Sequence, residues 1–135
     1  MSTLGNSFRT ALYNALNGNV TYTVYHIPPS SADSYVVISD ISEREQPNQT
    51  WREYDIYATI EIVTQFQKTG NRDNGLAVSK KIDDILRPTL TGSISFTGYN
   101  IAGCWLDDQY ENLSNENAGK YHRIVMSYYF KVIAV

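Results

Sequence analysis

The sequence has few cysteines and histidines and no long apolar segment, the features of disulfide-linked, metal-binding and membrane proteins. Its 135 residues include one cysteine, Cys104, which excludes an internal disulfide and any multi-cysteine metal site. The two histidines, His26 and His122, are too far apart for a short-range ligand motif. No segment approaches the roughly 18 apolar residues that span a bilayer, and residues 1–9 have no signal-peptide core. We therefore expect a soluble chain made in a reducing compartment, with no metal, no cofactor and no membrane partner.

Basic residues are also in the minority, at 11 Lys and Arg against 14 Asp and Glu, which gives a net charge of −3. This balance argues against a protein that binds nucleic acid by neutralising phosphates. The acids concentrate in residues 40–55 and 107–116, and the second of these segments contains no basic residue. Such segments are typical of solvated loops. The alternative is a surface for a basic partner, or a pore wall that repels DNA.

No catalytic spacing of nucleophile, base and acid is present, so we expect no catalytic residues. Residues 70–75 contain two glycines but lack the Lys-Ser/Thr that follows a phosphate-binding loop. Asp107, Asp108 and Glu111 would in principle hold a hard cation, which leaves a small metal-dependent hydrolase or nuclease as an alternative. A second alternative is a monomeric binding module, because the chain has 11 tyrosines.

Alternation of apolar and polar residues predicts a long half-buried strand over residues 52–66 and another over residues 122–134. Residues 35–41 predict a strand buried on both faces, and residues 19–27 a strand halted by Pro28 and Pro29. Residues 91–96 and 99–106 form either one bent strand or two short ones. The polar residues 42–50 and 107–120 are predicted to be loops.

Three- and four-residue spacing of apolar side chains predicts a helix from Thr3, stopped by Asn17 and Gly18. A second helix is predicted from an Asp73 cap to Pro88. Together these elements predict one domain over residues 1–135, of the α+β class, with an antiparallel or mixed sheet of about four to five strands packed against two helices.

Five segments carry a resemblance to a known family: the helix Phe8 to Leu16, the strand before Pro28 and Pro29, the Tyr-Val-Val-Ile strand from Tyr35, the long strand from Tyr54 to Val63, and the helix Ala77 to Leu86. In this order they resemble the small tail-terminator or tail-completion proteins, which join head and tail in tailed phages. The likeness covers roughly residues 7–90.

The resemblance implies a virion structural protein without catalytic residues, assembled in the host cytoplasm and located at the neck or tail. It implies a hexameric or dodecameric ring of this chain that stacks on neighbouring neck, connector or tail-tube proteins. DNA would pass through such a ring without specific binding.

Candidate contact residues follow from the polar segment 42–52 and from the outward faces of the two long strands, which differ in charge tendency. These faces either meet between subunits or pair across strands inside one sheet. The candidates for subunit or ring contact are Glu43, Arg44, Glu45, Trp51, Arg52, Asp55, Tyr57, Glu61, Arg123, Tyr129 and Lys131. The candidates for an acidic lumen or loop are Asp107, Asp108, Glu111 and Glu116.

Overall fold

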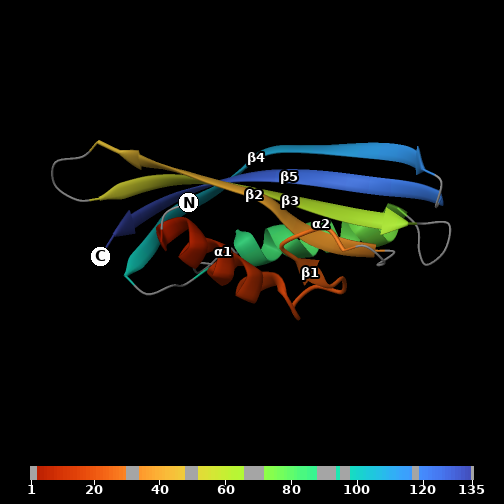
Figure 1. The fold of residues 1–135 in the computed structure, drawn as a ribbon, viewed down its shortest axis with the longest axis horizontal. Helices are drawn as coiled ribbons and strands as arrows, with labels where there is room; N and C mark the ends of the chain where they lie inside the picture. The colour runs from red at the N-terminus through yellow and green to blue at the C-terminus, as the bar shows by residue number, and fades with distance from the viewer. Residues whose placement is uncertain are drawn as a thin grey trace.

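The computed structural model describes residues 3–29, 34–47, 52–65, 72–87, 94, 98–116 and 119–134. The elements, in chain order, are α1 (Thr3–Leu16), β1 (Val24–Tyr25), β2 (Ser34–Gln46), β3 (Glu53–Gln65), α2 (Arg72–Leu86), β4 (Tyr99–Glu116) and β5 (Gly119–Ala134). Both helices lie on the same side of the strands (Figure 1). No helix of the described chain is long and apolar enough to cross a bilayer.

The strands form one sheet in the order β1-β2-β3-β5-β4. β1 pairs with β2 in parallel, and every other neighbouring pair is antiparallel. The sheet is therefore mixed, and the prediction of an α+β fold with two helices is confirmed.

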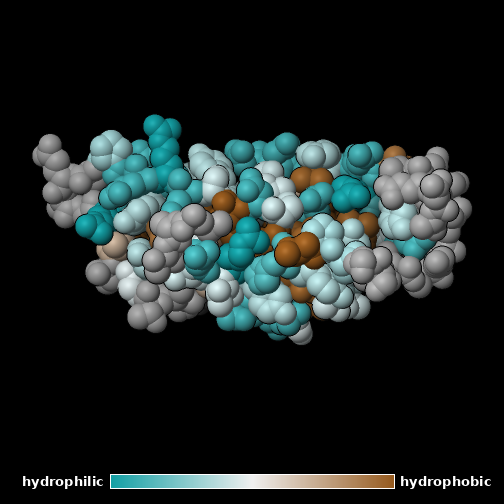
Figure 2. Space-filling view, in the orientation of Figure 1, coloured by the Kyte–Doolittle hydropathy of each residue, from teal (hydrophilic) through white to brown (hydrophobic). Residues whose placement is uncertain are grey.

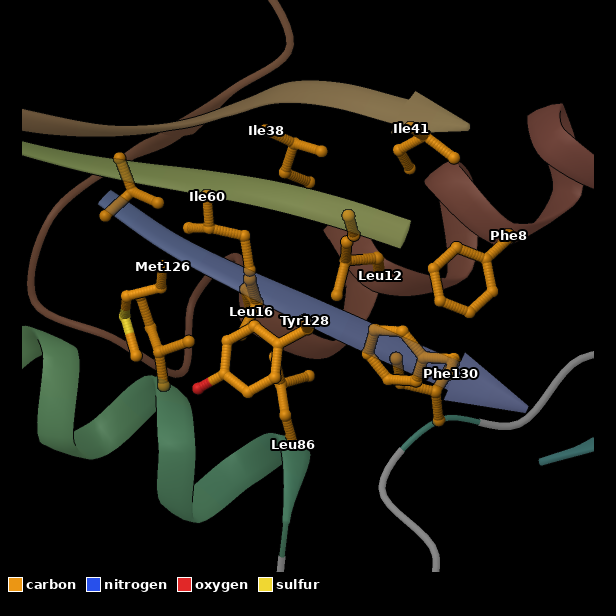
Figure 3. Close-up of a cluster of buried hydrophobic side chains, with 14 of the residues drawn as sticks. Phe8, Leu12, Leu16, Ile38, Ile41, Ile60, Leu86, Met126, Tyr128 and Phe130 are labelled. Atoms are coloured by element: carbon orange, nitrogen blue, oxygen red, sulfur yellow. The ribbon is translucent and has the colours of Figure 1, made fainter. Parts of the chain in front are cut away.

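The core lies between the helices and one face of the sheet, which we call the inner face. Figure 3 shows how α1, α2, β2, β3 and β5 contribute to it. Its largest fully buried side chains are Phe8, Leu12, Leu16, Ile38, Ile56, Ile60, Ile62, Ile82, Leu86, Ile124, Tyr128 and Phe130. In the space-filling view, hydrophobic side chains on the visible side form separate patches among hydrophilic ones, which is ordinary for a folded surface (Figure 2).

The alternation predicted for the long strand is confirmed in β3. Ile56, Ala58, Ile60 and Ile62 are all buried in the core, as a period of two requires. Val63, which belongs to the opposite set, is buried too. We call the sheet face away from the helices the outer face.

The prediction of a loop over residues 42–50 was wrong for its first half, because β2 continues to Gln46. Residues Ser42 to Gln46 pair in register with Glu53 to Tyr57 of β3. The backbone hydrogen bonds to β3 keep this polar segment extended, although it has few apolar side chains to bury. Residues 48–51 lie outside the described residues.

The predicted polar loop over residues 107–120 was also wrong, since β4 runs unbroken to Glu116 and β5 begins at Gly119. Ladder pairing with β5 spans Tyr99 to Glu116, with register shifts between Ile101 and Gly103 and between Leu106 and Asp108. These bulges reset which side chains face the core. The acidic segment is therefore strand.

Two other boundaries differ from the prediction. The expected strand over residues 19–27 shrinks to Val24–Tyr25, which pairs with Val36 and Val37 of β2. The second helix begins at Arg72, one residue before the predicted Asp73 cap. Residues 99–106 are strand as predicted, within β4, whereas residues 91–96 lie outside the described residues except Ile94, which is buried.

Candidate assembly surface

The outer face carries a ladder of opposite charges between β3 and β5. Lys131 Nζ lies 2.7 Å from Glu53 Oε1, and Arg123 Nη1 lies 3.2 Å from Glu61 Oε1. Both pairs join residues of adjacent antiparallel strands. Of the two arrangements that the sequence left open, these four side chains adopt cross-strand pairing within one sheet. For Glu61, Arg123 and Lys131, contact with another subunit stays a prediction.

Asp55 is a buried acid within this ladder, held from two sides. The Tyr129 hydroxyl donates to Asp55 Oδ1 at 2.5 Å, and Gln46 Nε2 donates to Asp55 Oδ2. The hydrogen bond to Asp55, with burial second, raises the pKa of Tyr129 to about 12. Three strands are thus joined at this point of the outer face by side chains as well as by the backbone.

Three aromatic rings lie in one row across β3, β5 and β4 beside Asp55. Tyr57 stacks on Tyr129 with ring centroids 5.1 Å apart, and Trp105 stacks on the same Tyr129, also at 5.1 Å. Tyr57 and Trp105 remain 45% and 48% exposed. We call Tyr57, Tyr129 and Trp105 the aromatic row, and it ends at the β4 edge of the sheet.

Gly103 makes room for the last ring of this row. A Cβ atom at position 103 would lie 2.3 Å from the Trp105 ring, closer than any real contact. The indole therefore lies flat over a strand position that has no side chain. Gly103 and Trp105 were missed at the sequence level, although a glycine two residues before a tryptophan in a strand was a readable signal for this packing.

We expect Gly103→Val to displace the indole and expose it to solvent. The stacking lost is worth about 0.5–1.5 kcal/mol. In a Trp51→Phe background, Trp105 emission should shift to longer wavelength and be quenched more readily by acrylamide. The matched control is Ala102→Val at the neighbouring exposed position, and equal spectra for the two variants would contradict this packing.

On the inner face, α2 is fastened to β5 through Asp83. The buried Tyr128 hydroxyl donates to Asp83 Oδ1 at 2.8 Å, and Arg87 donates to both carboxylate oxygens at 2.8 and 3.0 Å. Figure 3 shows the Tyr128 oxygen directed at α2. Burial opposes ionisation of Asp83, but the hydrogen bonds from Arg87 and Tyr128 outweigh it and lower the pKa. Burial also raises the pKa of the nearby Cys104 thiol to about 12.

Glu111 pairs inside the molecule instead of with the neighbouring acids. His122, which is buried, lies with Nε2 2.7 Å from Glu111 Oε1. In the β4 register Glu111 is opposite Ile124, a core residue, whereas Asp108 is opposite Ser127 on the outer face. Among the residues with described side chains, no three His, Cys, Asp or Glu converge as metal ligands.

The remaining candidates are spread along the sheet. Glu43, Arg44 and Glu45 lie on the extension of β2. Arg52 directly precedes β3, and its backbone carbonyl oxygen accepts a hydrogen bond from the Ala134 N–H at 3.0 Å. Asp107 and Glu116 lie on β4, while Trp51 lies outside the described residues. The structure brings together Asp55, Tyr57 and Tyr129, whereas the β4 acids Asp108 and Glu111 are opposite other residues of β5.

Among the residues that the structure describes, two edges of the sheet have no neighbouring strand, and both lie at the same end of the sheet. β4 is the last strand of the sheet and, in the part of the chain that the structure describes, pairs only with β5. β2 pairs with β1 only at Val36 and Val37, so no described strand covers the far side of its extension Ile41 to Gln46. Long open edges are templates for pairing with another chain.

No protein-family profile matches this chain, and no curated protein matches it either. Among solved structures, the chain is similar to one from a structure described as the virion of a native gene transfer agent (GTA) particle. The TM-score is 0.73 at 15% sequence identity, and the match covers 99% of this chain and 100% of the other. At this identity the likeness shows that the two chains share a fold.

Proposed function

We propose that this protein is a structural component of a phage or phage-like virion and, within it, a ring-forming tail terminator or head–tail connector subunit. The observation that carries the proposal is the fold shared along the full length with a chain of a virion. The order of elements over residues 7–90, which resembles the tail-terminator proteins, supports it independently.

The surface of the sheet suits a subunit that assembles. A ring forms when two different surfaces of one subunit meet head to tail and the rotation closes. The two open edges provide two such surfaces, and the exposed aromatic row ends at one of them. Partners would be further copies of this chain and the neck, connector or tail-tube layers above and below.

The acidic half of β4 fits a wall past which DNA moves. Asp107, Asp108 and Glu111 are exposed, and like charges repel the phosphates across a layer of water shorter than about 10 Å, the screening length at 0.1 M salt. DNA would then slide without binding. A protein with this role would be located in the neck or tail of a virion that is assembled in the host cytoplasm.

The metal-dependent hydrolase alternative has less support. Its three acids would have to converge on one ion, but Asp108 and Glu111 lie on opposite faces of β4 and Glu111 is held by His122. The exposed aromatic row keeps a monomeric tyrosine-rich binding module as the second candidate, because stacked exposed rings are also a ligand surface.

Mass measurement in solution separates these functions. We expect light scattering at increasing concentration to detect a hexamer or a dodecamer. The triple variant Asp107→Ala, Asp108→Ala, Glu111→Ala should keep this assembly. A chain that stays monomeric at every concentration, or a divalent-dependent activity that the triple variant loses, would contradict the proposal.

A further inference from the structure

The two open edges lie at the same end of the sheet and on opposite sides of it. Residues 41–46 of β2 pair with residues 53–58 of β3, which pair with residues 128–133 of β5. Those residues pair in turn with residues 100–106 of β4, and Tyr99 pairs with Ala134. A row across the sheet therefore starts at one open edge and ends at the other.

We infer that neighbouring subunits join edge to edge, with residues 41–46 of β2 in one copy pairing with residues 99–106 of β4 in the next. This inference rests on the proposed ring and names the surface that closes it. The occupant of each edge is a second copy of this chain, so the sheet continues from subunit to subunit.

Strand direction permits this contact. β2 runs antiparallel to β3, β3 to β5, and β5 to β4, so β4 and β2 of one sheet point in opposite directions. A copy related by rotation in head-to-tail order presents its β2 antiparallel to β4 of the previous copy. The new contact thus repeats the antiparallel pairing found between β2 and β3, and both sheets keep the same face outward.

Charge selects which half of β4 accepts the neighbour. Residues 99–106 carry no charge, whereas residues 107–116 carry four acids and no base. The arriving segment of β2 contains two acids, Glu43 and Glu45, and one base, Arg44, so acids are in excess in it, and like charges directly opposite each other destabilise a strand pair. The uncharged half is therefore the complementary edge, and the acidic half remains free.

The aromatic row gives this contact a side-chain component. Trp105 is the last ring of the row, at the β4 edge, and is 48% exposed. Arg44 is exposed on β2, opposite Asp55 in the register, and so lies on the outer face near the other edge. In the joined sheet Arg44 of the next copy lies beside Trp105, where a guanidinium is attracted to the ring face.

Cysteine cross-linking tests the edge pairing directly. In a Cys104→Ser background, Ser42→Cys and Ala102→Cys are combined in one chain and treated with a short bis-maleimide. Both positions are exposed. We expect a ladder of covalent dimers, trimers and higher species on a denaturing gel, because each copy offers both edges. The matched control combines Ser42→Cys with Asn112→Cys, in the acidic half of β4, and should give no ladder.

Each outcome of this experiment decides between the proposals. A ladder that stops at the dimer with Ala102→Cys alone indicates a two-fold contact between β4 edges and overturns the inference. A ladder from the Asn112→Cys control also overturns it. A ring detected by light scattering without any ladder overturns the inference and leaves the proposed function standing, whereas monomers throughout overturn both. Arg44→Gln, which removes the cation without placing a second acid opposite Asp55, should weaken the ladder while leaving the thermal unfolding midpoint of the subunit unchanged.

Discussion

Phe130→Ala is expected to lower the free energy of unfolding by about 3–5 kcal/mol, the range for truncating a fully buried aromatic ring. Phe130 is fully buried and meets Phe8 of α1 edge to face, with ring centroids 4.8 Å apart. The substitution leaves a cavity where β5 contacts the N-terminal helix. Since domains of this size are stable by about 5–15 kcal/mol, the variant should be largely unfolded under mild denaturing conditions.

Urea denaturation at neutral pH measures this effect, with Leu113→Ala as the matched control. Leu113 is an apolar side chain of the same sheet but is 56% exposed, so its truncation should cost no more than about 0.5 kcal/mol. Similar losses for the two variants would contradict the placement of Phe130. The large expected loss also means that Phe130→Ala reports on folding and is unsuitable as a test of ring assembly.

The elements whose burial follows a simple period were predictable from the sequence. Ile56, Ala58, Ile60 and Ile62 alternate because one face of β3 packs against the helices, and Leu12 and Leu16 are a helical turn apart because α1 buries one stripe. In both cases the spacing of apolar side chains along the sequence matches the face of the element that is buried. The α+β class followed from the order of these elements.

The strand extensions at Ser42 to Gln46 and Asp107 to Glu116 were not predictable in the same way. Their side chains are polar, so hydrophobic periodicity carries no signal, and they are extended because β3 and β5 offer backbone partners along their length. These segments are strands because the neighbouring strand pairs with them, and their own side chains give no sign of it. When a polar segment follows or precedes a long regular strand in a hairpin, its sequence therefore fits a paired strand as well as it fits a loop.

For the candidate surface, the sequence predicted which single residues face outward but not how they are grouped. Asp55, Tyr57 and Tyr129 were recognised as outward-facing from their parity in the strand. Their joining to Trp105 depends on the register of β4 against β5, which two bulges shift. Because a one-residue shift moves every side chain to the other face, single-sequence reasoning did not place Trp105 in the aromatic row.

Asp83→Asn is the second substitution with a large expected effect, because one carboxylate joins α2 to the sheet. It accepts hydrogen bonds from the buried Tyr128 hydroxyl and from Nε and Nη2 of Arg87. A hydrogen bond to a charged group contributes about 1.5–3 kcal/mol. We expect Asp83→Asn to lower the free energy of unfolding by about 1.5–3 kcal/mol in total at pH 7. Asp84→Asn, whose carboxylate is 59% exposed and pairs with Lys80, is the matched control and should cost far less.

The dependence of this loss on pH identifies the carboxylate as its source. The pKa of Asp83 in the folded chain lies below its ordinary value, so its stabilising contribution is complete above the unfolded pKa of about 3.9 and is lost as the pH falls through the folded pKa. Asp83→Asn has no such group to protonate. The gap in unfolding free energy between the parent and Asp83→Asn should therefore be constant near neutral pH and narrow below about pH 4. A gap that stays constant into acid would mean that the variant loses packing and not a charged hydrogen bond, and the attachment of α2 to β5 would then depend on the surrounding core alone.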